Sequence, residues 1–152
     1  MVDPVESVKG EVLRRIVESG AFPLAKIQQQ NTAAPKHAPY CRLTMAQGAE
    51  WIFTSQGLME KTVIAEIDIF TPQMTNTQTA GSYASTIEQA FGLYDRKSEK
   101  RNIPMPGWKG ATACVTEFAR SSTSEESEKS LYKLPVLLYI RITLVKGAAY
   151  EV

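Results

Sequence analysis

The sequence predicts an α+β domain, in which a mostly antiparallel β-sheet carries two amphipathic helices packed on one face. Alternating apolar and polar residues, typical of half-buried strands, recur through the middle and the end of the chain. Two other segments have apolar residues three and four positions apart, which is typical of helices that cover a sheet. One of these segments precedes the expected strands, and the other lies between them. The chain has 152 residues, so we expect one domain over residues 1–152.

The first helix is expected to begin after Asp3, a capping residue, with Pro4 at the first helical position and Gly20 closing the end. Its apolar stripe consists of Val5, Val8, Val12 and Ile16, widened by Leu13 and Val17. The second helix is expected from about Ala80 to Tyr94. Its stripe consists of Tyr83, Ala84, Ile87, Ala90, Phe91 and Tyr94.

Alternation and flanking turn residues predict strands at Tyr40–Ala46, Glu60–Pro72, Ala111–Arg120 and Leu131–Val145, with a possible short strand within Leu24–Gln30. Pro135 lacks an amide hydrogen, which favours a bulge or an edge position near the start of the last strand. Flexible loops are expected at about residues 47–60, 95–110 and 121–130.

The strand Glu60–Pro72 has one apolar face, formed by Val63, Ala65, Ile67 and Ile69. Its other face carries Glu66 and Asp68, and the order of the strands allows Arg42 and Arg141 to lie on this same face. Three interpretations are open: an ion ladder on the free face of the sheet, the same ladder in contact with a neighbouring subunit, or acid–base chemistry by the two carboxylates.

Other chemistry has little support in the sequence. The formal charge of +1 provides no general attraction for nucleic acid, and no nucleotide-binding motif is present. His37 is the single histidine, without ligands at chelating spacing, so we expect no metal site and no cofactor. Cys41 and Cys114 are expected to be free thiols in a reducing cytoplasm. No apolar run is long enough for a membrane span.

Two loop features point to surfaces for partners. Trp51, Ile52 and Phe53 lie together in an expected hairpin tip, where they either form a protein interface or fold back onto the sheet. Trp108 presents the same alternatives. The basic segment Arg96–Arg101 is expected to be a solvated surface, with phosphate binding as the second interpretation.

The order of these segments resembles that of the tail terminator, or tail-completion, proteins of tailed bacteriophages. The resemblance covers nearly the whole chain: an amphipathic helix, the connector IQQQNTAAPKHAP, the strand YCRLTMA, a long hairpin, and two final strands of which the last is long and apolar. Its most specific part is VIAEIDIFTP followed by TQTAGSYASTIEQAF, a strand with an acidic-aromatic ending before a small-residue turn and a helix.

The resemblance implies a structural virion protein without enzymatic activity, located in the tail and neck and assembled in the host cytoplasm. It implies a ring, typically a hexamer, that caps the tail tube, stops its polymerisation and joins it to the head. Expected partners are other copies of the chain, the tail-tube protein and a head–tail connector or head-completion protein. DNA would only pass through the lumen. Arg42, Trp51, Ile52, Phe53, Glu66, Asp68 and Arg141 are the candidate interface residues.

Three alternatives remain. The protein could be another neck component, such as a head-completion or tail-tube protein. It could be a small enzyme that uses Glu66 and Asp68, or a monomeric adaptor that binds through Trp51–Phe53.

Overall fold

The computed structural model describes residues 3–30, 32–46, 50–72, 77–121, 124–126 and 131–151. The described residues form α1 (Pro4–Glu18), α2 (Thr77–Ala90) and two 3₁₀ turns, η1 (Leu24–Lys26) and η2 (Glu99–Arg101). The strands are β1 (Ile27–Gln28), β2 (Tyr40–Ala46), β3 (Ile52–Phe53), β4 (Met59–Pro72), β5 (Asn102–Ile103), β6 (Trp108–Arg120), β7 (Ser124–Glu126) and β8 (Leu131–Tyr150).

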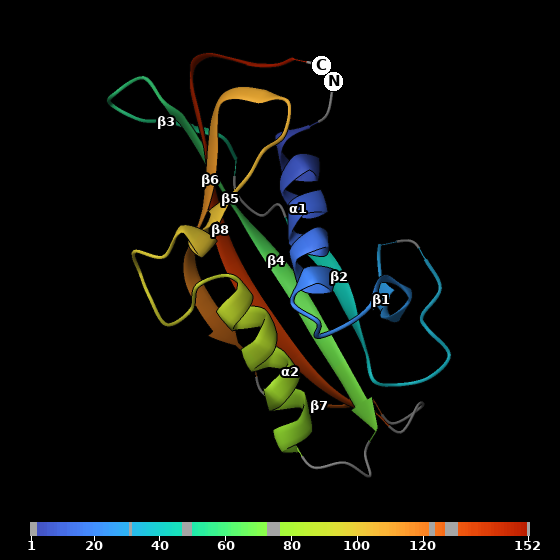
Figure 1. Cartoon of the computed structure of the whole chain (residues 1–152). Helices are drawn as coiled ribbons and strands as arrows, with labels where there is room; N and C mark the ends of the chain where they lie inside the picture. Colours follow the sequence, from blue (N-terminus) through green and yellow to red (C-terminus); the bar gives the residue numbers. More distant parts are fainter. Residues whose placement is uncertain are drawn as a thin grey trace.

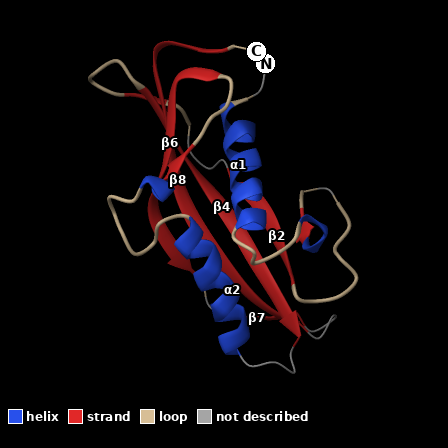
Figure 2. Cartoon of the chain, viewed as in Figure 1, coloured by secondary structure: helices blue, strands red, loops and turns tan. Residues whose placement is uncertain are grey.

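One sheet of eight strands carries both helices on the same face, as Figures 1 and 2 show. The strand order is β1-β2-β4-β8-β6-β5, with β3 added to β4 and β7 added to β8. All these pairs are antiparallel except β1 with β2, which is parallel. The predicted α+β class, with a mostly antiparallel sheet and two helices on one face, is therefore confirmed.

The core lies between the helices and the covered face of the sheet. The predicted apolar face of β4 is buried there, together with alternate residues of β8 from Leu134 to Ile142, because alternate residues of a strand point to the same face of the sheet. The helices supply the other side of the core: α1 contributes Val5, Val8, Val12 and Ile16, and α2 contributes Ala80, Ala84 and Ile87. Both helices pack against a single sheet face, so the described residues place no helix on the other face (Figure 1).

Helix α1 begins as its sequence predicts. The side chain of Asp3 accepts a hydrogen bond of 2.8 Å from the amide of Val5, and Pro4 occupies the first helical position. Helix α2 runs earlier than predicted, since it starts at Thr77 and ends at Ala90. The backbone of Gly92, with φ of +84°, turns the chain away after it. Tyr94, predicted to extend the stripe of this helix, is instead 75% exposed.

Pro135 lies near the start of β8, at a point where the described residues give it a strand partner on one side only. It pairs regularly with Asp68 of β4, but on its other side β6 has ended and β7 has not begun. The carbonyl of Pro135 accepts a hydrogen bond from the amide of Ser121, so this side of the residue faces the end of β6. The strand β8 lies between β4 on one side and β6 and β7 on the other, so the predicted edge position is wrong, and the regular pairing of Pro135 with Asp68 shows no bulge toward β4.

Three predicted loops contain secondary structure within their described residues. The segment 47–60 includes β3, the segment 95–110 includes η2 and β5, and the segment 121–130 includes β7. Residues 47–49, 122–123 and 127–130 lie outside the described residues. The predicted short strand within Leu24–Gln30 is divided between η1 and β1.

Candidate functional site

The predicted charge pair on the free face of the sheet is present in part. Arg42 of β2 lies directly opposite Asp68 of β4, and its Nη2 donates to Oδ2 of the carboxylate at 2.8 Å. The Nε of the same guanidinium is 3.3 Å from this oxygen. Lys133 of β8 approaches from the other side, with its Nζ 4.0 Å from Oδ2. Three adjacent strands thus meet at one carboxylate.

The carboxylate of this charge cluster is buried, whereas its two cations are partly exposed. The side chain of Asp68 is 0% exposed and that of Arg42 is 37% exposed. Tyr40 and Phe70 stack beside it with ring centroids 4.8 Å apart, and the guanidinium of Arg42 lies 5.2 Å from the centre of the Phe70 ring. The prediction of an ion ladder on the open face of the sheet is therefore wrong for Asp68, because its carboxylate is fully buried.

Glu66 lies next to the cluster and is half-buried. Burial raises the pKa of its carboxyl group above the ordinary value, and the neighbouring charge of Asp68 raises it further. Lys133 opposes this shift. Two carboxyl groups two positions apart on one face compete for the same cations, and Asp68 holds the closer contact with Arg42.

Arg141 does not join these residues, which corrects the predicted grouping. It shares the free face of the sheet, but the register of β8 places it opposite Thr62 of β4 and Cys114 of β6. Asp68 lies opposite Pro135 instead, six positions along the strand. The position next to the carboxylate is taken by Lys133, which our sequence analysis did not single out. Lys133 and Arg141 lie on the same face of β8, and only the register between β4 and β8 decides which of them lies beside Asp68.

The predicted cluster Trp51–Phe53 does lie beside a hairpin turn, and its members separate. Trp51 is half-buried and packs against the core, with the Nζ of Lys61 5.7 Å from its ring centre. Ile52 and Phe53 form β3, where they are 64% and 73% exposed. Trp51 therefore folds back onto the sheet, whereas Ile52 and Phe53 are exposed, and an interface role for these two residues stays a prediction.

The β3–β4 hairpin projects beyond the helical layer, at the end of the sheet where β8 also finishes (Figure 1). Its turn is closed by hydrogen bonds between Thr54 and Leu58 and between Gly57 and Thr54. Gly57 has φ of +79°, a conformation that favours glycine. A two-stranded projection has no layer on either side, which explains why adjacent residues of β3 are both exposed.

An apolar groove of about 480 Å³ lies between this hairpin and the end of β8. One wall includes Phe53 and Met59, and the other includes Leu144 and Val145. The second wall exists because the pairing of β6 with β8 jumps from Ala111–Leu144 to Lys109–Ala149, which leaves residues 145–148 of β8 bulged outward. We call the exposed side chains of β3 together with this groove the apolar arm.

The second half of the apolar arm was not predicted from the sequence. The last strand was expected to end at Val145, whereas β8 continues to Tyr150. The glycine in VKGAAY is the signal that could have indicated the bulge, since Gly147 has φ of +83°. On the opposite strand, Gly110 leaves room for the side chain of Val145, which a Cβ atom would contact closely.

No group of three or more histidine, cysteine, aspartate or glutamate residues in the described part of the chain could hold a metal ion. Cys41 is a buried free thiol, and its burial raises its pKa to about 12. No helix within the described ranges is long and apolar enough to cross a membrane.

Comparisons with known proteins identify the fold but no family. No protein-family model matches the chain, and no curated protein matches it. A solved structure whose name states no function superposes with a TM-score of 0.61, covering 90% of this chain and 94% of the other at 12% sequence identity. At this identity the similarity shows a shared fold alone, so the class defined here is that of α+β domains with two helices on one sheet face.

Proposed function

We propose that this protein is a tail terminator of a tailed bacteriophage, a structural subunit that forms a ring on the tail tube, stops tube growth and offers a joining surface to the head. The sequence resemblance supplies the family. The apolar arm is the structural observation that supports an assembly role. A subunit of a ring must present apolar surface that remains uncovered in the isolated chain, and the apolar arm has this property.

The amount of uncovered apolar surface is consistent with a reversible contact. Burying a complete isoleucine or phenylalanine side chain contributes roughly 1.5–3 kcal/mol. Since Ile52 and Phe53 are 64% and 73% exposed, covering both would contribute roughly 2–4 kcal/mol per subunit. A contact of this size is too weak to hold two free subunits together. When it is repeated at every interface of a closed ring that is bound to a template, the contributions add, and assembly on the template is favoured.

The free face of the sheet supports a structural role over an enzymatic one. Asp68 is fully buried and bound by Arg42, so a substrate has no access to the carboxylate that the enzyme alternative requires. Apart from burial, the groups that perturb the pKa of the Glu66 carboxyl are Asp68, Lys133 and Arg42, which all belong to this charge cluster. The charge cluster instead joins β2, β4 and β8, and thereby stiffens the scaffold that carries the apolar arm.

Electron microscopy of particles from a phage with a disrupted gene tests the proposal directly. We expect overlong tails separated from DNA-filled heads. Normal tails, or heads that leak DNA, would refute tail termination and move the protein to the head side of the neck or out of the particle.

A complementary experiment uses the double variant Ile52→Ser with Phe53→Ser. It should fold like the wild type, because both side chains are exposed, but should fail to restore normal tail length. The matched control is Leu24→Ser, an exposed apolar residue (57%) outside the apolar arm, which should restore normal tails. Equal activity of the two variants would remove the apolar arm from the proposal.

A further inference from the structure

A second concave surface lies along the outer edge of β6. It is a pocket of about 990 Å³, and its walls include five consecutive residues of this strand, Cys114–Phe118. Successive residues of a strand point to opposite faces of a sheet, so they can line one pocket only where that pocket runs along the edge. The facing wall comes from the segment between α2 and β5, including Leu93, Tyr94 and Arg101.

The edge of β6 within this pocket is unpaired. Strand β5 pairs with β6 only at Ala113 and Cys114, and no other described residue pairs with the outer side of β6. From Val115 to Arg120 the strand pairs with β8 alone, apart from a bulge between Val115 and Glu117. Its outward amide hydrogens and carbonyl oxygens therefore form a template to which another extended chain can add.

The pocket is also strongly cationic. Four of its lining side chains, Arg96, Lys97, Arg101 and Arg141, carry positive charge, against the single carboxylate of Glu117. None of the four forms an ion pair with a residue in the described part of the chain. The whole chain has a formal charge of only +1, so this local excess is a specific feature of the pocket.

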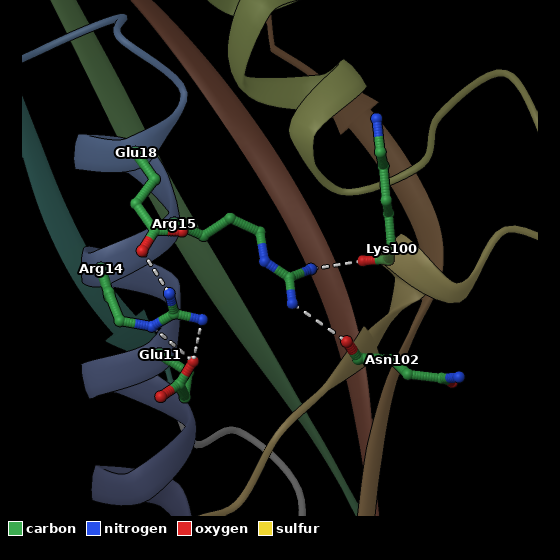
Figure 3. A network of polar contacts seen from close by, with 6 residues as sticks. All are labelled: Glu11, Arg14, Arg15, Glu18, Lys100 and Asn102. Atoms are coloured by element: carbon green, nitrogen blue, oxygen red, sulfur yellow. Dashed lines mark hydrogen bonds and ion pairs between the residues drawn. The ribbon is translucent and has the colours of Figure 1, made fainter.

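The wall opposite β6 is held in place by hydrogen bonds. Arg101 donates from Nε to the carbonyl of Gly92 at 3.0 Å and from Nη2 to that of Leu93 at 3.1 Å, while its guanidinium lies 5.0 Å from the centre of the Phe118 ring. Figure 3 shows Arg15 of α1 reaching the carbonyls of Lys100 and Asn102 at the end of the same segment. A ligand thus meets a largely preformed site, which reduces the ordering cost of binding.

We propose that this pocket binds an acidic segment of a partner protein in extended conformation, which adds a strand to the edge of β6. A phosphodiester backbone offers acceptors only and would leave the outward carbonyls of β6 without donors. A peptide supplies both donors and acceptors in alternation, and its carboxylates can meet the cations on either side of the strand. This site is separate from the apolar arm and goes beyond the proposed function, so either proposal can fail without the other.

Fluorescence anisotropy with a labelled decapeptide of alternating glutamate and threonine tests the charge requirement. We expect saturable binding that weakens as salt is raised, whereas a peptide of alternating lysine and threonine should not bind. The triple variant Arg96→Gln, Lys97→Gln, Arg141→Gln should bind the acidic peptide at least roughly tenfold more weakly, since each exposed charge contributes a few-fold. All three side chains are exposed, so the variant should remain folded.

The control is Lys36→Gln, the loss of one positive charge at an exposed residue between β1 and β2, at the opposite side of the sheet, and it is compared with the single variant Arg141→Gln, which removes one charge from the pocket. Lys36→Gln should bind the acidic peptide as the wild type does. Equal weakening in the control would overturn the assignment to this pocket, as would absence of binding to the wild type.

Amide hydrogen exchange, followed by NMR, tests strand addition. The bound peptide should slow exchange at outward amides between Val115 and Arg120, and amides of β2, on the other side of the sheet, should not change. Binding without this protection would overturn strand addition. An oligothymidylate that binds more tightly than the acidic peptide and loses affinity in the same triple variant would overturn the peptide assignment in favour of nucleic acid.

Discussion

The contact between Arg42 and Asp68 makes a prediction whose direction follows from the unequal burial of its partners. Replacing Arg42 with methionine leaves a carboxylate that is 0% exposed, with only Lys133 4.0 Å away. Breaking a buried ion pair costs about 3–5 kcal/mol of stability. Because Lys133 still partly compensates the charge of Asp68, we expect a loss of about 3 kcal/mol. Asp68→Asn should cost only about 1 kcal/mol, because the guanidinium that remains is 37% exposed and can be hydrated.

Urea denaturation followed by circular dichroism at neutral pH measures both free energies of unfolding. In thermal denaturation, the same losses should lower the melting temperature by about 6–12 °C for Arg42→Met and about 2–4 °C for Asp68→Asn. The double variant Arg42→Met with Asp68→Leu removes both charges and should recover most of the stability. Glu66→Gln is the matched control on the same face and should not destabilise the protein. Equal losses for the two single variants, or the reverse order, would refute the reasoning from burial.

Three further predictions concern other sites. Because the pKa of the Glu66 carboxyl group is raised in the folded protein, its contribution to stability is present below the unfolded pKa of about 4.5 and is lost as pH rises through the folded pKa. In parallel denaturation series, Glu66→Gln should therefore gain stability relative to the wild type from pH 4 to 8. Gly110→Ala should destabilise the protein, because its φ is +73° and the added Cβ meets a side chain of β8, whereas Gly10→Ala in an open position of α1 should stabilise it by about 0.5–1 kcal/mol, both measured as thermal shifts. Cys41, buried with a pKa of about 12, should react with a thiol reagent at pH 8 only after unfolding, while the half-buried Cys114 should react in the native protein; rapid native labelling of both would contradict the burial.

Local patterns in the sequence predicted most of the secondary structure correctly. The cap at Asp3 and the stripe from Val5 to Ile16 specify α1, because capping and helical periodicity depend on residues within a few positions of one another. The strand prediction for Tyr40–Ala46 matches β2, and that for Glu60–Pro72 differs from β4 by one residue. The end of α2 was predicted less well, since Tyr94 fits the helical period while Gly92 has already turned the chain.

The sequence predicted several residues of the candidate site correctly, but it did not predict which of them lie in contact. Alternation placed Arg42 and Asp68 on one face, and the pairing of β2 with β4 then brought them into contact. Burial of the carboxylate was not predictable, because it depends on how side chains from several strands pack on the free face of the sheet. The cluster Trp51–Phe53 was recognised, but its division into one packed and two exposed residues depends on how far β3 projects from the sheet.

The sequence alone determined which segments become helices and strands and which face of each strand is apolar, since these properties are encoded in periods of two and 3.6 residues and in caps and turn residues. The tertiary structure decided which distant residues meet. The register of β8 against β4 and β6 placed Lys133 rather than Arg141 beside Asp68, and brought Arg141 into the pocket along β6. Strand register over such separations is set by core packing along the whole strand, and no local pattern of residues contains it.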